Sequence, residues 1–226
     1  KDRRHPKNVF VCSKCGTLSE TDDRESPGIC SACGQELRLS GPAKRNRCVC
    51  KYCKTVNRYP RPAEGPLEHR LFALEYHCPT CKPEHKGRFF KSPDEKDLAK
   101  IRAAAKNWKE TDPGSIPDDA ILAGDESDRL FRWGYTHYYE MFNDRQKLAL
   151  ELSCRLILSQ ANERVRNALA TNLSDLLRYQ NMLCRYDTMA LKSLDIFSVH
   201  GFPVGLIQCE SNFLGIRDEK RNVSIG

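Results

Sequence analysis

Cysteine is the residue type in this chain best suited to chemistry, and eight of the 12 cysteines form four C-x2-C pairs. The first two pairs, separated by 14 residues, are Cys12/Cys15 and Cys30/Cys33. A two-residue spacer lets both thiolates of a tight turn face one tetrahedral ion, and the glycine after each pair suits a turn with positive φ. Four thiolates leave no position open for water or substrate, so we predict a structural zinc site rather than a catalytic one.

The other two pairs are Cys50/Cys53 and Cys78/Cys81, separated by 24 residues. A lysine replaces the glycine after each of these pairs, and Cys48 lies two residues before the first of them. The regular spacing favours Cys50 as the ligand, with Cys48 as the alternative. The prediction is two structural Zn²⁺ ions in all, the second held by these two later pairs.

A disulfide framework is the other explanation for many cysteines. The chain has no basic segment followed by an apolar stretch, which is the pattern of a secretory signal. Metal-binding C-x2-C turns are therefore favoured over disulfides. Zinc ribbons have little apolar surface to bury, so the metal must supply much of their folding free energy, on the order of 10 kcal/mol per site. The isolated Cys154, Cys184 and Cys209 are expected to be buried thiols without chemistry.

The net charge of +7 is concentrated in the cysteine-rich part. Residues 1–93 contain 19 Lys and Arg against 10 Asp and Glu, whereas residues 94–226 contain 18 against 20. Between Glu36 and Glu64 there are eight bases and no acid. Because cations neutralise phosphates and tyrosine rings stack on exposed bases, this stretch predicts contact with nucleic acid; a solvated loop is the alternative. The predicted contact residues are Arg38, Lys44, Arg45, Arg47, Lys51, Tyr52, Lys54, Arg58, Tyr59 and Arg61.

The later part of the chain has helical patterns. A helix is predicted from a cap at Ser92 to about Lys109, with Pro93 in its first turn. Its expected apolar face consists of Leu98, Ile101, Ala105 and Trp108. Prolines, glycines and acids in residues 110–128 predict an extended acidic connection rather than a packed element.

Two further helices are expected behind a capping box formed by Asn143 and Gln146. The first ends near Gln160 and the second runs from about Asn162 to Tyr186, so the short link predicts an antiparallel hairpin. The expected buried stripes are Leu148, Leu152 and Leu156 in the first helix, and Val165, Leu169, Leu173, Leu176 and Leu183 in the second.

Six of the 19 aromatic residues lie between Phe131 and Phe142. Such a cluster suits either stacking on an unpaired base or anchoring a core, and we favour the core because aromatic clusters are more often buried. His200 has no second titratable group or nucleophile at a recognisable spacing, so we assign it a structural role.

These patterns predict an α+β fold, with two small zinc-ribbon units of short β-hairpins followed by a helical region that contains an antiparallel helix pair. Strands are expected mainly within residues 8–90, with 9–11 and 88–90 extended. No apolar run approaches 18 residues, so we expect no membrane span and a cytoplasmic location. The expected divisions are a double zinc-ribbon region (1–91), a helix and acidic linker (92–128), and a helical region (129–226).

Two short sequence motifs, together with the leucine-rich helix that follows them, resemble a known family. The motifs are Trp133-Gly134-Tyr135 and Phe142-Asn143-Asp144-Arg145-Gln146. Together they resemble the middle of large prokaryotic adenine-specific DNA methylases, in which cysteine-rich zinc-ribbon insertions interrupt the methyltransferase domain. The resemblance covers about residues 116–213, and the type and order of the cysteine pairs agree with it.

The resemblance implies an S-adenosylmethionine-dependent enzyme that methylates N6 of adenine after flipping the base from the duplex. The family's Asp/Asn-Pro-Pro-Tyr/Phe motif and its glycine-containing cofactor loop do not occur in this sequence, so no catalytic residue is carried over. Because the chain begins at Lys1 without Met, we interpret it as a piece between the cofactor-binding and catalytic motifs. S-adenosylmethionine would then bind to the parent enzyme and not to this piece.

The expected function is therefore a zinc-binding insertion that helps such a methyltransferase recognise its DNA target. The expected partners are DNA, the remainder of the methyltransferase chain and subunits of a defence system. The alternative is a zinc-ribbon interaction module that docks a partner subunit of a restriction or phage-defence assembly. A free-standing zinc hydrolase or deaminase is disfavoured, because four thiolates close both predicted metal sites.

Overall fold

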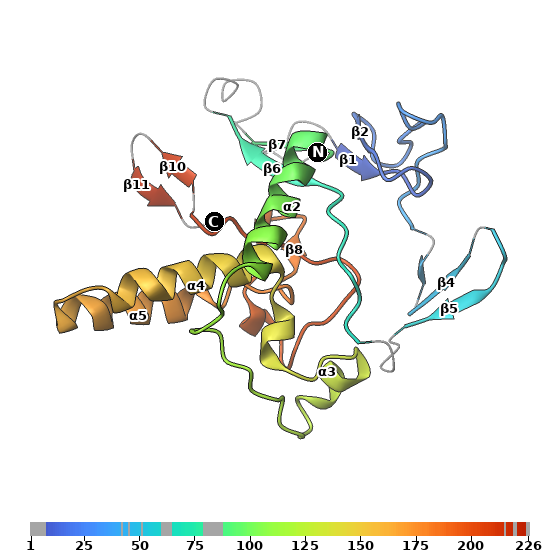
Figure 1. Cartoon of the computed structure of the whole chain (residues 1–226). Helices are drawn as coiled ribbons and strands as arrows, with labels where there is room; N and C mark the ends of the chain where they lie inside the picture. The colour runs from blue at the N-terminus through green and yellow to red at the C-terminus, as the bar shows by residue number, and fades with distance from the viewer. Residues whose placement is uncertain are drawn as a thin grey trace. The chain divides into compact units, whose positions relative to one another are not determined.

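The computed structural model describes residues 8–41, 43–44, 46–50, 52–59, 65–78, 88–214, 216–218 and 221–224 (Figure 1). The chain divides into two compact units: the first comprises Lys1–Pro60 and Glu68–Leu98, and the second comprises Arg61–Leu67 and Ala99–Gly226. The boundary therefore falls within helix α2 (Glu95–Lys109). None of the helices in the described part of the chain has the length and apolar content that crossing a membrane requires.

Short antiparallel strands make up most of the first unit. They are β1 (Asn8–Val11), β2 (Leu18–Thr21), β3 (Ala43–Lys44), β4 (Arg47–Val49), β5 (Val56–Arg58), β6 (Leu74–His77) and β7 (Arg88–Lys91). β1 pairs with β2, β6 pairs with β7, and β3, β4 and β5 form a three-stranded sheet in that order. The segments predicted to be extended, 9–11 and 88–90, lie in β1 and β7.

Among the described residues of the first unit, the hydrophobic core is very small and consists largely of cysteine. Its buried residues are Cys12, Cys30 and Leu37, and its half-buried residues are Phe10, Cys15 and Cys33. Apolar burial scales with the area removed from water, so a core of this size stabilises the unit only modestly. A ligand that joins the cysteines would stabilise the same residues that form the core.

Helix α2 begins at Glu95, whereas a helix capped by Ser92 would begin at Pro93. The cap is Asp94, whose Oδ1 accepts a hydrogen bond from the N–H of Asp97 (3.0 Å) while its own N–H donates to Asp97 Oδ2 (3.0 Å). Ser92 Oγ instead accepts a hydrogen bond from the N–H of Leu18 in β2 (2.9 Å), so the prediction of a Ser92 cap is wrong. The predicted apolar face is confirmed, because its four members are half-buried: Leu98, Ile101, Ala105 and Trp108.

The second unit is mainly helical, with short strands near the end of the chain. After α2 its elements are α3 (Asp128–Arg132), the 3₁₀ helix Tyr138–Met141, α4 (Asp144–Leu158), α5 (Glu163–Leu176), β8 (Tyr186–Asp187), β9 (Lys192–Ser193), the 3₁₀ helix Ile196–Ser198, β10 (Ile216–Asp218) and β11 (Arg221–Ser224). The hairpins β8–β9 and β10–β11 are antiparallel, and the mixture of helices and antiparallel hairpins confirms the α+β class. These two hairpins lie beyond residues 8–90, where most strands were expected. The sequence did not predict them, because strands of so few residues carry no alternating pattern.

The core of the second unit forms around the aromatic segment. Its buried residues are Ile121, Leu130, Tyr135, Met141, Leu183 and Val204. Phe131, Trp133 and Phe142 pack against this core half-buried, so the interpretation of the segment as a core anchor is confirmed. Gly134 has a φ of 85°, and a Cβ at this position would collide with the backbone of Gly65, so glycine is required between the two aromatic residues.

The acidic connection is anchored at two points, so the prediction that residues 110–128 do not pack is wrong. Ile121 is buried in the core of the second unit. The N–H of Ser115 donates to Oε2 of Glu151 in α4 (2.9 Å), and Glu151 is only 1% exposed. Burial alone would raise the pKa of Glu151, but hydrogen bonds from Arg155 and Ser115 outweigh burial and lower it. The average polarity of residues 110–128 could not predict these two anchors, because each depends on a single residue.

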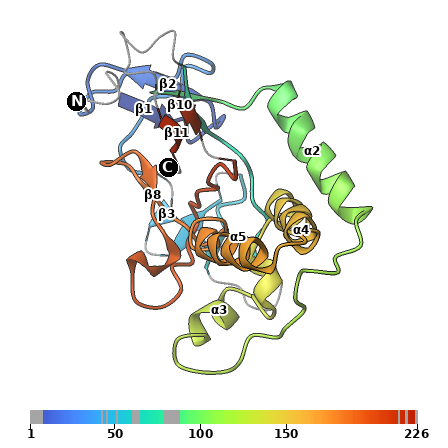
Figure 2. The same cartoon turned by 90° about the vertical axis from the view of Figure 1, so that its left-hand side faces the viewer.

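The predicted capping box at the start of α4 is confirmed. The N–H of Gln146 donates to Asn143 Oδ1 (2.9 Å), and the N–H of Asn143 donates to Gln146 Oε1 (3.1 Å). α4 and α5 run side by side, as predicted for the helix pair (Figure 1 and Figure 2). α5 ends at Leu176 rather than near Tyr186. Just beyond this point the backbone N–H groups bond three residues back, as Arg178 does to Asp175 (3.2 Å), and the side chain of Asn181 donates to the carbonyl oxygen of Leu177 (2.8 Å).

Half of the eight residues of the predicted buried stripes of the helix pair are exposed. Leu156 is 67% exposed and Leu169 is 39% exposed, and no residue of α5, which is described in full, is buried. The only described element in extensive contact with α5 is α4. The leucine spacing therefore marks an amphipathic face that the described residues cover only in part. The exposed members are Leu152, Leu156, Val165 and Leu169; Leu148, Leu173 and Leu176 are half-buried; and Leu183 is buried in the core beyond the helix.

Candidate metal centre and basic sheet

Two tight turns of the first unit present the first four cysteines. In the turn that follows β1, the N–H of Gly16 donates to the carbonyl oxygen of Cys12 (2.8 Å), and the N–H of Cys12 donates to that of Thr17 (3.0 Å). The second turn repeats both bonds, from Gly34 to Cys30 (2.9 Å) and from Cys30 to Gln35 (2.7 Å). The glycines have φ values of 78° and 69°, as predicted from their position after each pair.

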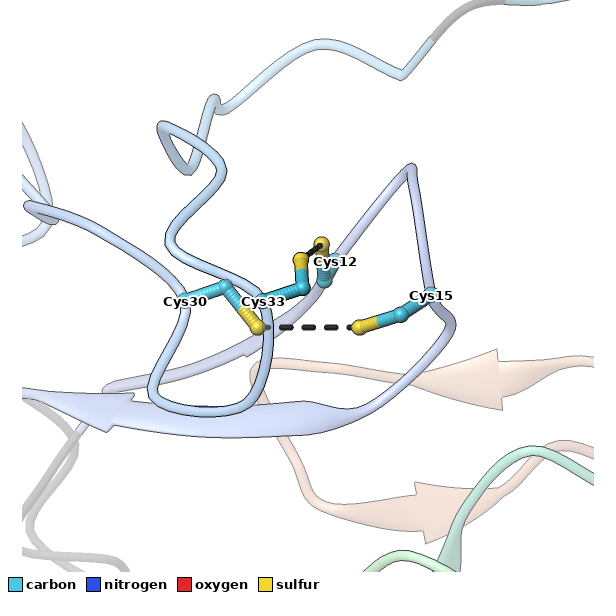
Figure 3. Close-up of side chains that lie close together, drawn as sticks. All are labelled: Cys12, Cys15, Cys30 and Cys33. Carbon is cyan, nitrogen blue, oxygen red and sulfur yellow. Dashed lines mark hydrogen bonds between the residues drawn. The ribbon is translucent and has the colours of Figure 1, made fainter.

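The four sulfurs converge, as the sequence predicted (Figure 3). Sγ of Cys12 lies 3.6 Å from Sγ of Cys33, and Sγ of Cys15 lies 3.7 Å from Sγ of Cys30. All four lie within 4.8 Å of one another. A tetrahedral ion with metal–sulfur bonds of about 2.3 Å separates its ligands by roughly 3.8 Å. The cluster therefore has the dimensions of a four-thiolate site and can hold one metal ion.

Hydrogen bonds tune the acidity of the cluster. The side chain and backbone of Thr17 lower the pKa of Cys15 to about 6, and a backbone N–H of its own turn lowers the pKa of Cys30. The backbone of Gln35 lowers the pKa of Cys33, but burial and the neighbouring sulfurs outweigh this effect and raise it to about 11. These hydrogen bonds thus favour the thiolate forms of Cys15 and Cys30, and a cation beside Cys33 would favour its thiolate as well.

A third turn of the same type occurs at Cys50. The N–H of Lys54 donates to the carbonyl oxygen of Cys50 (3.0 Å), and the N–H of Cys50 donates to that of Thr55 (2.9 Å). Lys54 has a φ of 62°, so it takes the conformation that glycine has in the first two turns. Cys48 lies on β4 instead, and its sulfur donates to the carbonyl oxygen of its neighbour Val49 (3.7 Å). This turn favours Cys50 over Cys48 as a ligand.

The second metal site stays a prediction. Cys50, Cys53 and Cys78 do not form a group of three ligands among the described residues, and Cys81 lies outside the described residues. The Cys53 sulfur lies 3.2 Å from Oγ1 of Thr55, and the side chain and backbone of Thr55 lower the pKa of Cys53 to about 7. Thr55 thus favours the thiolate form of Cys53, which is the form that a metal ion binds.

Two threonines contribute to these sites that the sequence reasoning missed. Thr17 and Thr55 each bond to the sulfur of the second cysteine of their turn, Cys15 and Cys53. A sequence signal existed, because both turns read C-x-x-C-x-T. Threonine at this position places a hydroxyl and a backbone N–H beside one sulfur.

The structure places part of the basic stretch on one small sheet. Lys44, Arg47 and Arg58 lie in β3, β4 and β5 and are exposed. Tyr52 lies in the Cys50 turn at the tip of the β4–β5 hairpin and is 83% exposed. Of the other predicted contact residues, Lys54 is exposed in the same turn, Tyr59 is half-buried, Arg38 forms an ion pair with Glu36 (2.8 Å), and Arg45, Lys51 and Arg61 lie outside the described residues.

The remaining candidates show no catalytic arrangement within the described residues. Cys184 is fully buried, and burial raises the pKa of its thiol to about 11. Cys154 and Cys209 are half-buried rather than buried, and burial raises the pKa of Cys154. His200 is exposed in a loop.

No protein-family model, curated protein or solved structure matches this chain.

Proposed function

We propose that the chain is a zinc-binding, DNA-contacting part of an S-adenosylmethionine-dependent adenine-specific DNA methyltransferase. The convergence of four cysteine sulfurs in the first unit carries the proposal. A site closed by four thiolates is structural, because it offers no open coordination position for water or substrate. The role of this unit is therefore to hold a surface in place.

Zinc is the metal that this donor set favours. Soft thiolate ligands in a tetrahedral arrangement select Zn²⁺ or iron, and they disfavour Mg²⁺ and Ca²⁺, which prefer oxygen. Mass spectrometry of the purified chain distinguishes zinc from iron by mass, and a colourless protein agrees with zinc. We expect two zinc ions per chain, the first on Cys12, Cys15, Cys30 and Cys33 and the second on Cys50, Cys53, Cys78 and Cys81.

DNA contact is supported by the exposed cations of the β3–β4–β5 sheet. Lys44, Arg47 and Arg58 are exposed in a sheet that carries no acidic residue in its strands. Each Lys or Arg that neutralises a phosphate releases a condensed counterion, so affinity for duplex DNA should fall by about 0.9 log units per tenfold rise in salt for each contact.

The methyltransferase assignment rests on the resemblance in residues 116–213. In this chain the two motifs that resemble the family have structural roles: Tyr135 is buried in the core, and Asn143 and Gln146 form the capping box. They support a folded scaffold between the cofactor-binding and catalytic motifs of the parent enzyme. S-adenosylmethionine and the adenine would then bind elsewhere in the parent chain.

The test is fluorescence anisotropy of the chain with a 20-base-pair duplex at 50 and 200 mM salt. We expect binding at the lower concentration and a loss of at least tenfold at the higher one. The double variant Arg47→Gln/Arg58→Gln should weaken binding and flatten the salt dependence. The control with the same change in charge is Lys100→Gln/Arg164→Gln, which alters exposed bases outside the sheet. No binding at 50 mM salt, or equal effects of both double variants, would refute the DNA contact.

The alternative proposal is a protein-interaction module that docks a subunit of a restriction or phage-defence assembly. The aromatic segment is packed in the core, so it does not supply the surface. The exposed apolar residues of α4 and α5, Leu152, Leu156, Val165 and Leu169, favour this second function. Calorimetry with a purified subunit of such an assembly, comparing wild type with Leu156→Lys, tests whether this face binds that partner.

A further inference from the structure

Three cations lie side by side across the β3–β4–β5 sheet. Lys44 is directly opposite Arg47, and Arg47 is directly opposite Arg58. Directly paired residues of neighbouring strands lie on the same face, so the three side chains form a row across the sheet. Neighbouring strands are about 4.8 Å apart, so the row spans roughly 10 Å. Like charges directly opposite one another destabilise a sheet, and an anion bound across the row removes that repulsion.

The same face continues toward the tip of the β4–β5 hairpin with apolar residues. Val49 and Val56 are directly opposite each other, and each is two residues from Arg47 or Arg58, so the side chains share the face of the row. Both valines are exposed. The other face of the same strands carries Ala43, Cys48 and Asn57. The cations and the exposed valines are therefore gathered on one side of the sheet.

The tip beyond the valines is a fixed turn that carries an exposed ring. The backbone bonds of the Cys50 turn close it, and Lys54 at a φ of 62° sets its direction. Tyr52 is 83% exposed in this turn. Along the hairpin, toward its tip, the order is thus a charged row, an apolar pair and an exposed aromatic residue.

We propose that this face binds one unpaired DNA strand, with phosphates on the Lys44–Arg47–Arg58 row and a base stacked on Tyr52. The inference rests on the proposed DNA contact and adds that the bound DNA is single-stranded. A duplex offers only phosphates and base edges at its surface, whereas an unpaired strand also offers base faces, which an exposed aromatic ring can cover. A single row of cations follows one backbone, and the valines contact the sugars between the phosphates and the base.

The experiment measures anisotropy of the full chain with a fluorescein-labelled 12-nucleotide dT strand and with the corresponding 12-base-pair duplex, both at 50 mM salt. We expect tighter binding of the single strand. Tyr52→Ala should weaken single-strand binding about 5- to 150-fold, the effect of losing one stacked base, and should change duplex binding little. Tyr52→Phe keeps the ring and should retain the affinity. Tyr138→Ala, the same truncation of an exposed tyrosine in the second unit, should have no effect.

The outcomes separate this inference from the DNA contact itself. If wild type binds the single strand and Tyr52→Ala, with unchanged metal content, binds it equally well, the stacking inference is overturned while the DNA contact stands. Tighter binding of the duplex than of the single strand also overturns it. Tighter binding of a 12-nucleotide U strand of RNA overturns the assignment to DNA. No binding of either DNA probe refutes the proposed DNA contact, and the inference with it.

Discussion

Removing the metal from the four-cysteine cluster is expected to unfold residues 8–37 while the second unit stays folded. The buried core of this region is Cys12, Cys30 and Leu37. At about 1.5 to 3 kcal/mol for a fully buried apolar side chain, these residues contribute no more than about 9 kcal/mol. A structural zinc ion contributes on the order of 10 to 16 kcal/mol. Loss of the metal thus removes the larger stabilising contribution, while the entropy cost of ordering both turns is unchanged.

The assay is hydrogen exchange measured by mass spectrometry before and after chelation, with the metal content determined on the same samples. Backbone amides of β1, β2 and residues 30–37 should lose their protection when the metal is removed. Amides of α4 around Leu150 should keep theirs, because the core of the second unit contains aliphatic and aromatic side chains and no cysteine ligand.

A matched pair of variants gives the same test without a chelator. Cys33→Ser removes one of the four converging sulfurs and should reproduce the exchange pattern of the metal-free protein. Cys154→Ser alters a half-buried thiol of the second unit and should leave the metal and the exchange pattern unchanged. Slow exchange throughout residues 8–37 in a sample shown to be free of metal would refute the reasoning, since the small core would then suffice.

Three further predictions concern single residues. Cys50→Ser should lower the zinc content by one ion per chain, whereas Cys48→Ser should leave it unchanged; equal losses would contradict the choice of Cys50. Asn143→Ala removes the cap of α4 and should destabilise the second unit by about 1 kcal/mol in urea unfolding; an unchanged midpoint would count against this role. The N–H of Asp97 is the main cause of the lowering of the Asp94 pKa from 3.8 to about 2. The unfolded state therefore binds more protons in this range, so the stabilisation by Asp94 is full above pH 4 and lost as pH falls from about 4 to 2. Asp94→Asn should abolish that dependence, and unfolding curves of both proteins from pH 2 to 6 test it.

Features that depend on a few neighbouring residues could be predicted from the sequence. The capping box at Asn143 and Gln146 is set by two side chains three residues apart. The convergence of Cys12, Cys15 and their partners follows from the two-residue spacer, because each tight turn places two sulfurs on one side. In both cases the geometry is fixed within one turn of the chain.

Features that depend on distant partners could not be predicted. Ser92 has the sequence context of a helix cap, yet it bonds to Leu18, 74 residues away. The spacing of Leu156 and Leu169 identifies an apolar face of each helix, but periodicity does not say whether another element covers it. The carboxylate of Glu151 accepts hydrogen bonds from Arg155, one helical turn away, and from Ser115, and nothing near Glu151 in the sequence signals the bond to Ser115, 36 residues away.

At Lys54, which has a left-handed backbone conformation, the stability of the fold and the positive charge of the hairpin tip favour different residues. A side chain in this region of φ costs about 1 kcal/mol relative to glycine, which occupies the equivalent position in the first two turns. Lys54→Gly would relieve that cost, and it would also delete a positive charge beside Tyr52. A selection for heat resistance alone would therefore favour glycine here, and a selection for affinity toward a polyanion would favour lysine. Thermostability screens of this chain would consequently tend to erode the charge of the hairpin tip.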